Sequence, residues 1–161
     1  MNAKLCFLIA TSAPTYLDEA KTNMAARDLF HDAVKTALQK EGWTITHDPL
    51  SIRIGGVGME IDLGAERLIA AEKDEEKIAV EIKSFIRPSA ISEFHAAVGQ
   101  YMNYRKALGQ REPDRPLYLA VPKETYSSFF ALPFISECIA DYNLKILVYD
   151  AENEAVTKWK K

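Results

Sequence analysis

The sequence predicts a single α/β domain in which a mixed central β-sheet is flanked by helices. Residues 25–41 and the region that begins at Ser89 carry apolar side chains at helical spacing. The runs 117–121 and 144–149 are almost entirely apolar, which is typical of strands buried within a parallel sheet. Between the two helical regions, apolar and polar residues alternate as they do in strands. The resulting order of helix, meander, helix, strand, helix and strand favours an α/β sandwich.

The chain has 161 residues, enough for one compact domain and too few for two ordinary ones. We assign the domain to residues 24–161 and interpret residues 1–23 as a poorly ordered or atypical N-terminal extension, with Met24 as an alternative first residue. The apolar run at residues 5–10 is far too short to span a membrane. A short edge strand is the alternative interpretation of that run, and no membrane association is expected.

The first helix is expected over residues 25–41, because its apolar side chains recur at helical spacing and Gly42 then provides a stop. These side chains belong to Leu29, Phe30, Ala33, Val34, Ala37 and Leu38. Residues 43–46 alternate as a strand, and Asp48-Pro49 closes that strand as a turn. Glycines 55, 56 and 58 allow tight bends before the central strands.

The second helix and the later strands complete the predicted order. The buried stripe of the second helix is expected to comprise Ile91, Phe94, Val98, Tyr101 and Met102. The proline-bounded run 116–122 predicts a buried strand. A helical stretch over 123–141, interrupted at Pro133, leads to a second buried strand at 144–149. Residues 155–158 are expected to add a short edge strand.

Three polar residues, Asp62, Glu81 and Lys83, lie in predicted strands that are otherwise largely apolar. Side chains alternate faces along a strand, so residues 79–85 place Glu81 and Lys83 on one face and their apolar neighbours on the other. In residues 59–63 the same alternation sends Asp62 away from the apolar face. We therefore expect two neighbouring strands to aim these three side chains at one point.

Two carboxylates that lie close together repel each other, and a hard divalent cation such as Mg²⁺ (or Mn²⁺) relieves that repulsion. We expect Asp62 and Glu81 to bind the cation, with the carbonyl of Ile82 as an additional ligand. Lys83 would then support an attacking water or the charge that builds on phosphorus. The alternative is a half-exposed surface ion pair between Glu81 and Lys83, which needs no function.

Asp62, followed after 18 residues by Glu81-Ile82-Lys83 in an apolar strand, resembles the PD-(D/E)XK nuclease superfamily. A longer resemblance, from Met24 onward, is carried by the segments FHDAVKTALQKEGWTITHDPL, EIDLGAERLIAAE, IAVEIKSF, SAISEFHAAVGQYMNYR and LYLAVP. Together these segments resemble the XisH family of excision controlling factors. The resemblance implies a restriction-endonuclease-like α/β fold and a role in programmed excision of a DNA element by site-specific recombination. It also implies action on DNA, together with an XisI-like small protein and, indirectly, a recombinase.

The resemblance singles out further residues near the expected site. Gln100 and Tyr104 match a QxxxY element in which the glutamine lies near the metal centre and the tyrosine helps to hold DNA. His31 occupies the position where the superfamily often carries a glutamate on the first helix. Ser84 could bind a phosphate oxygen or simply end the strand. The alternative for His31, Gln100 and Tyr104 is a helix flank with satisfied polar groups.

The overall charge leaves both an enzymatic and a binding role open. A formal net charge of −3 argues against a broadly basic nucleic-acid binder but leaves room for a local basic patch. Candidates for such a patch are Arg53, Arg87, Arg105, Lys106, Arg111 and Arg115. The two cysteines are far apart and without metal-ligand spacing, so a reducing, cytoplasmic location is expected.

Two functions remain as the main hypotheses, and a third alternative is a toxin-like or regulatory pair with an XisI-like protein, without DNA specificity of its own. The first is a Mg²⁺-dependent deoxyribonuclease that uses Asp62, Glu81, Lys83 and Gln100. The second is a catalytically silent protein with a nuclease fold that acts by binding DNA or an XisI-like partner. The sequence also allows a homodimer, and it contains no recognisable base-reading module that would indicate a DNA specificity.

Overall fold

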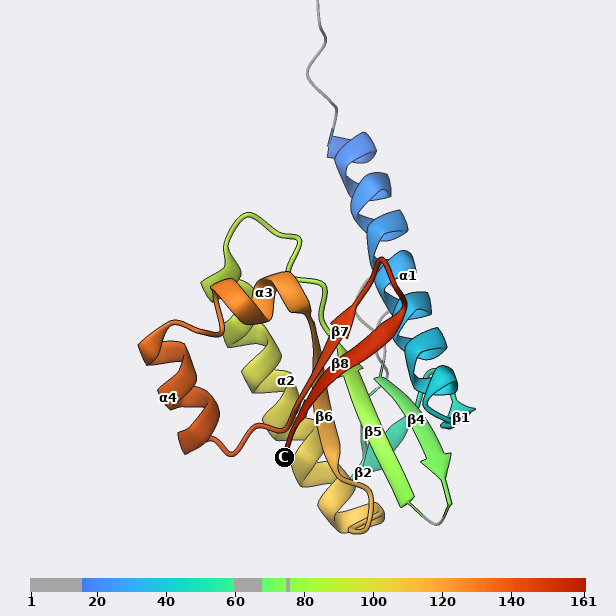
Figure 1. The fold of residues 1–161 in the computed structure, drawn as a ribbon. Helices are drawn as coiled ribbons and strands as arrows, with labels where there is room; N and C mark the ends of the chain where they lie inside the picture. The colour runs from blue at the N-terminus through green and yellow to red at the C-terminus, as the bar shows by residue number, and fades with distance from the viewer. Residues whose placement is uncertain (1–15, 60–67, 75) are drawn as a thin grey trace, which may run out of the picture.

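The computed structural model describes residues 16–59, 68–74 and 76–161, which form a mixed α/β domain (Figure 1). The described elements, in chain order, are α1 (Tyr16–Lys40), β1 (Thr44–His47), β2 (Ile52–Ile54), β3 (Val57–Met59), β4 (Leu68–Lys73), β5 (Glu76–Ile82), α2 (Ala90–Arg111), β6 (Leu117–Pro122), α3 (Lys123–Ser128), α4 (Pro133–Asp141), β7 (Ile146–Asp150) and β8 (Ala155–Lys160).

The central sheet has six described strands in the order β1-β4-β5-β6-β7-β8. The pairs β5–β6 and β6–β7 are parallel, and the remaining pairs are antiparallel. The helices lie on both faces of this sheet. The prediction of a mixed central sheet with flanking helices is therefore confirmed.

Strand β6 shows how both faces of the sheet are buried. Leu117, Leu119 and Val121 pack into the core under α2, α3 and α4, while Tyr118 and Ala120 pack into the core under α1. All six residues of the strand are buried. A strand with two buried faces needs a nearly continuous apolar sequence, which is why this run could be recognised from composition.

Helix α1 begins at Tyr16, well before the start expected at residue 25. Its first two turns extend beyond the body of the domain, and the side chains of residues 16–19 and 21–25 are exposed (Figure 1). The buried part of the helix begins at His31 and includes Val34 and Leu38, both fully buried. Leu29, which was expected on the buried face, is 71% exposed.

Helix α2 starts where the sequence predicts, because the hydroxyl of Ser89 accepts a hydrogen bond from the backbone N–H of Ser92 at 3.3 Å. Phe94 and Tyr101 are buried as expected. Ile91 and Met102 were expected to be buried but are exposed, since the buried face is rotated toward Ala97 and Tyr104.

The segment 59–63 was expected to form a strand that aims Asp62 toward Glu81, but residues 60–63 lie outside the described residues. Among the described strands, the neighbours of β5 are β4 and β6. Strand β3 ends at Met59 and pairs with β2 in a separate hairpin, in which Gly55 and Gly56 form the turn with φ angles of 58° and 79°. Two successive positive φ angles are the geometry that a tight hairpin turn requires, and glycine adopts them at little cost.

Pro133 divides the helical stretch after β6 into α3 and α4, as predicted, and the final edge strand β8 forms as well. Within the described residues, no helix is long and apolar enough to cross a bilayer.

Candidate active site

The candidate site lies where β5 ends, on the face of the sheet that α2 covers. Val80 and Ile82 point into the core under α1, while Ala79 points into the core under α2. Glu81 therefore points toward α2, and Lys83 follows on the same side. The prediction that Glu81 and Lys83 share one face is confirmed. Both residues are buried, with exposed fractions of 1% for Glu81 and 4% for Lys83.

The side chains of Glu81, Lys83 and Gln100 meet at this position. The ammonium of Lys83 lies 3.3 Å from Oε1 of Glu81, and it donates a hydrogen bond to Oε1 of Gln100 at 2.6 Å. Gln100, which the resemblance places near a metal centre, thus lies against Lys83 in the structure. Because the carboxylate is as buried as the ammonium, the alternative of a half-exposed surface ion pair does not describe this arrangement.

Tyr104 lies one helical turn after Gln100 and faces the same region. Burial and the nearby Glu81 carboxylate raise the pKa of the Tyr104 phenol to about 12. Burial also raises the pKa of Tyr101, with Glu81 as a minor contributor. The phenol of Tyr104 is consequently neutral at physiological pH and retains a proton that it can donate in a hydrogen bond.

The backbone around Lys83 is held by its neighbours in the sheet. The N–H of Lys83 donates to the carbonyl of Ala120 on β6 at 2.9 Å, and the hydroxyl of Tyr149 on β7 donates to the carbonyl of Lys83 at 3.4 Å. Ser84, a predicted accessory residue, is 3% exposed at the end of this segment. The site is thus built on a rigid element, which favours accurate positioning of side chains.

His31 lies in a second polar cluster rather than against Glu81. Its Nε2 is 2.9 Å from Oδ1 of Asp48, and its Nδ1 is 3.3 Å from Oδ1 of Asp32. Lys35 donates to the other oxygen of Asp48 at 2.7 Å. Burial opposes ionisation of Asp48, but the Lys35 hydrogen bond and the charge of His31 outweigh burial and lower the pKa of this carboxyl.

The two clusters lie toward the same end of the sheet. His47 on β1 pairs with Ala70 on β4, and Leu68 on β4 pairs with Glu81 on β5. Asp48 therefore follows β1 near the level of Glu81, with β4 between them. Lys35 was missed at the sequence level, although its i, i+4 spacing from His31 is a signal that both side chains share one face of α1.

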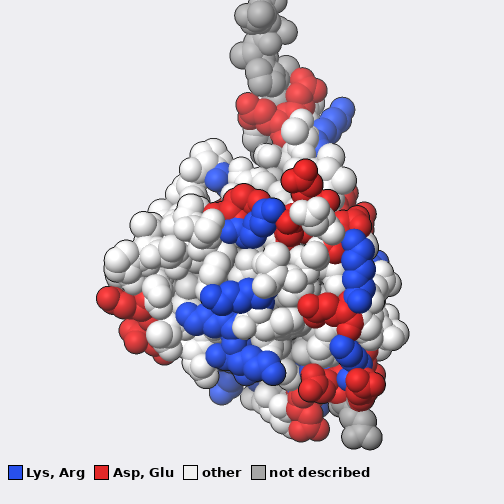
Figure 2. All heavy atoms as spheres, viewed as in Figure 1, with Lys and Arg blue, Asp and Glu red and all other residues white. Residues whose placement is uncertain are grey.

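Three of the six basic residues considered for a local patch, Arg105, Arg111 and Arg115, are engaged within the domain. Arg115 is buried and forms ion pairs with Glu72 and Glu112. Arg111 donates to the carbonyl of Arg53, and Arg105 donates to the carbonyls of Tyr142 and Asn143. Figure 2 instead shows basic side chains gathered over β7 and β8, on the face turned to the viewer.

Sequence comparison decides the family. The family model described as "XisH protein" matches residues 24–157 of the chain. The chain belongs to the XisH family. The match begins at the residue from which the resemblance was expected.

Two solved structures are similar to this XisH chain. One is the crystal structure of an XisH family protein from Nostoc punctiforme, with 55% sequence identity and a TM-score of 0.78 over 83% of this chain and 100% of that one. The other is a fdxN element excision controlling factor protein from Anabaena variabilis, with 55% identity and a TM-score of 0.78 over 83% of this chain and 99% of that one. No curated protein matches this XisH chain.

The remaining predicted ligand of this XisH chain, Asp62, lies outside the described residues. The described part of β4 begins at Leu68, which pairs with Glu81. Across residues 16–59, 68–74 and 76–161, no group of three or more His, Cys, Asp or Glu side chains could hold a metal ion. Glu81 supplies hard oxygen donors of the kind Mg²⁺ and Mn²⁺ prefer, so a complete ligand set depends on Asp62.

Proposed function

We propose that this chain is a controlling factor for the programmed excision of a DNA element and that it hydrolyses DNA phosphodiesters with Mg²⁺ or Mn²⁺. The excision role is inferred from the Anabaena variabilis relative, a fdxN element excision controlling factor at 55% identity. The hydrolytic role assumes a restriction-endonuclease-like, PD-(D/E)XK arrangement of Asp62, Glu81 and Lys83. DNA, an XisI-like small protein and, indirectly, a recombinase would be its partners.

The observation that carries the hydrolytic role is the buried contact between Glu81, Lys83 and Gln100. Removing a carboxylate and an ammonium from water costs several kcal/mol per ion, and mutual attraction recovers that cost only in part. The surrounding strands are already joined by backbone hydrogen bonds and apolar contacts, so the fold does not need the charged pair at this place. Charged groups that a fold buries in this way are concentrated at functional sites.

Each residue would have a distinct role. Asp62 and Glu81, with the carbonyl of Ile82, would hold the cation, which when bound polarises a phosphodiester and acidifies a water molecule. Lys83 would release its contact with Gln100 and place its ammonium against the attacking oxygen or a phosphate oxygen. Gln100 orients Lys83 before substrate arrives.

The accessory residues would act on the nucleic acid or beside the site. The neutral phenol of Tyr104 and the hydroxyl of Ser84 would donate to phosphate oxygens. His31 would act from the neighbouring cluster with Asp48, as a positioning group near the bound strand. A homodimer would let two such sites cut the two strands of a duplex.

A catalytically silent accessory function is the second candidate, and the two contacts of the Lys83 ammonium favour it. The Lys83 ammonium is already held by both Glu81 and Gln100, an arrangement that also suits a static structural pair. In that case the chain would act through DNA binding or through an XisI-like partner.

Cleavage of duplex, single-stranded and branched DNA by the purified protein, with Mg²⁺ or Mn²⁺ added, tests the proposal. Two variants are informative: Asp62→Asn, and the double variant Glu81→Gln/Lys83→Met, which removes both buried charges together. Alanine substitutions are unsuitable, because each would leave one buried charge alone. We expect each variant to lose about 100-fold or more of the cleavage rate.

A matched control is the double variant Glu137→Gln/Lys21→Met, which makes the same chemical changes at exposed positions of α4 and α1. This control should cleave as the wild type does. If the wild type binds DNA but cleaves none of these substrates, even with an XisI-like partner present, the silent accessory function replaces the nuclease.

A further inference from the structure

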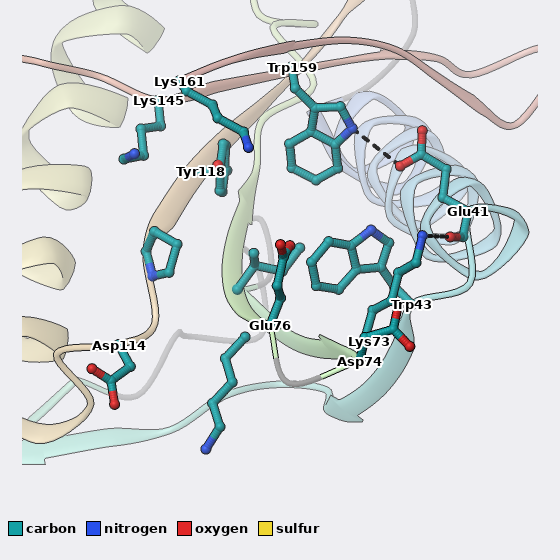
Figure 3. Close-up of a pocket in the computed structure, with 13 residues that line it drawn as sticks. Glu41, Trp43, Lys73, Asp74, Glu76, Asp114, Tyr118, Lys145, Trp159 and Lys161 are labelled. Atoms are coloured by element: carbon teal, nitrogen blue, oxygen red, sulfur yellow. Dashed lines mark hydrogen bonds between the residues drawn. The ribbon is translucent and has the colours of Figure 1, made fainter.

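A pocket of about 780 Å³ opens at the opposite end of the sheet from the candidate active site (Figure 3). It lies where β5 and β6 begin and where β8 ends, with Glu76, Tyr118 and Trp159 among its lining residues. Pockets that bind small molecules usually enclose about 300–1,000 Å³. The volume is therefore suitable for a ligand of nucleotide size.

Aromatic rings form one wall of this pocket. Trp159 packs edge-on against Tyr118, with ring centroids 4.9 Å apart, and lies 6.1 Å from Trp43. The indole N–H of Trp159 donates to Oε2 of Glu41 at 3.2 Å, which fixes the ring and uses its only donor. The two indoles are too close together to admit a ring between them. A planar ligand would instead stack against the half-buried Trp159.

Charged side chains are distributed unevenly around the aromatic wall. In Figure 3 the carboxylate of Glu76 points into the middle of the pocket, between Trp43 and Tyr118. Burial and the Glu76 carboxylate raise the pKa of the Tyr118 phenol, consistent with that proximity. Lys145 and Lys161 lie together on the Tyr118 side, and the Lys145 ammonium is 5.9 Å from the Tyr118 ring centroid.

The other acidic residues that line the pocket leave Glu76, Lys145 and Lys161 available to a ligand. Asp74 and Asp114 lie across the pocket from Lys161, and both side chains are exposed (Figure 3). Glu41 is engaged by the indole of Trp159. One side of the pocket therefore combines an aromatic surface, a carboxylate that only accepts hydrogen bonds, and two lysines.

We propose that this pocket binds a guanine nucleotide, either free or as an unpaired residue of a nucleic-acid strand. The base stacks on Trp159, as bases stack on aromatic side chains in single-strand binding proteins. The adjacent N1–H and N2–H groups of guanine donate to the two oxygens of Glu76. Lys145 and Lys161 bind the phosphate as point charges.

This site is separate from the candidate active site. Glu76 and Glu81 lie at opposite ends of β5, about 17 Å apart along the strand at the usual rise per residue. The pocket also opens on the face covered by α1, whereas Glu81 faces α2. Nucleotide binding here does not depend on whether the chain cleaves DNA.

Tryptophan fluorescence provides a direct test, because the only two tryptophans of the chain, Trp43 and Trp159, both line the pocket. Guanosine monophosphate should quench the emission of the full chain in a saturable way. Thymidine monophosphate should bind at least about tenfold more weakly, since its base offers one donor flanked by two carbonyls that repel a carboxylate. Guanosine without phosphate should also bind more weakly than the nucleotide.

Variants distinguish the roles of the base and phosphate contacts. Glu76→Gln should abolish the preference for guanine while the phosphate contribution remains. Lys145→Ala/Lys161→Ala should weaken the nucleotide but not the nucleoside. The matched control Glu137→Gln, on α4, should bind as the wild type does.

Competition identifies the source of the ligand. A single-stranded oligonucleotide with one guanine should compete with the free nucleotide if the site serves nucleic acid, whereas a free nucleotide site would bind the monophosphate alone. The absence of saturable quenching by both ligands would overturn the proposal. Equal binding of the guanine and thymine nucleotides, unchanged in Glu76→Gln, would also overturn it.

Discussion

Two buried cations in this domain, Lys83 and Arg115, have the same exposed fraction of 4% but very different surroundings. Arg115 donates to the carbonyl of Ile78 at 2.9 Å and forms ion pairs with Glu72 and Glu112 at 2.9 and 2.7 Å. The side chains of these two acids are 41% and 40% exposed. The Glu81 carboxylate that faces Lys83 is only 2% exposed.

This difference separates a structural charge from a candidate functional one. Arg115 connects β4, β5 and the end of α2, and its acidic partners still reach water, so its burial has a clear structural purpose. Lys83 and Glu81 are both withdrawn from solvent where β5 ends, at a place where the strands are already joined by backbone hydrogen bonds. A buried charge therefore suggests function when its partner is equally buried and the surrounding elements are held together without it.

The largest expected effect comes from breaking the Lys83 contact. Lys83→Met should lower the free energy of unfolding by about 3–5 kcal/mol, because it leaves the Glu81 carboxylate buried and uncompensated. The double variant Glu81→Gln/Lys83→Met should recover stability to within about 1 kcal/mol of the wild type. Urea unfolding of the three proteins measures both values. Equal destabilisation of the single and double variants would contradict the comparison.

A smaller effect is expected at Arg115. Arg115→Met should cost about 2 kcal/mol, chiefly because the buried carbonyl of Ile78 loses its donor. Adding Glu72→Gln and Glu112→Gln should give no recovery, since both carboxylates already reach solvent. The same urea experiment provides the measurement. A recovery like that expected at Lys83 would show that the two cations are equivalent.

The smallest effect at neutral pH concerns Tyr104, because the pKa of its phenol depends in part on the charge of Glu81. Burial and Glu81 raise its pKa from 10.0 to about 12, so the folded protein holds this proton more tightly than the unfolded chain. The contribution to stability is fully present below pH 10.0 and is lost as the pH rises toward 12.

Tyrosinate absorbance, compared between the wild type and Tyr104→Phe, isolates this titration. In the double variant Glu81→Gln/Lys83→Met, the Tyr104 titration should move to lower pH, while burial keeps it above the ordinary tyrosine value. A titration at the ordinary tyrosine pH in the wild type would show that Tyr104 does not lie in the field of Glu81.

The orientation of the candidate site could be predicted from sequence because strand alternation is a local property. The period of two places Glu81 and Lys83 on one face whatever the strand pairs with, and the helical period places Gln100 and Tyr104 one turn apart. The choice of neighbouring strands is not local, so alternation could not predict that β5 pairs with β4 and β6. The Gly55-Gly56 pair between Ile54 and Val57 is a hairpin signal that would have separated β3 from the sheet.

Contacts between segments that are distant in the sequence could not be predicted from sequence patterns. Trp43 and Trp159 lie at opposite ends of the domain sequence, and no periodicity connects them. The hydrogen bond between His31 and Asp48 likewise depends on how the turn after β1 approaches α1. Burial of Glu81 and Lys83 also depends on where α2 lies, which alternation within β5 alone does not determine.

The contact between α1 and β8 has a consequence for how the chain folds during synthesis. Glu41 binds the indole of Trp159, and Lys40 binds Glu154 and the carbonyl of Asn153. Helix α1 is synthesised well before β8, so it acquires this cover only when β8 has been made. Complete cover of α1 must therefore await the synthesis of β8, and until then the helix exposes surface to which a chaperone can bind.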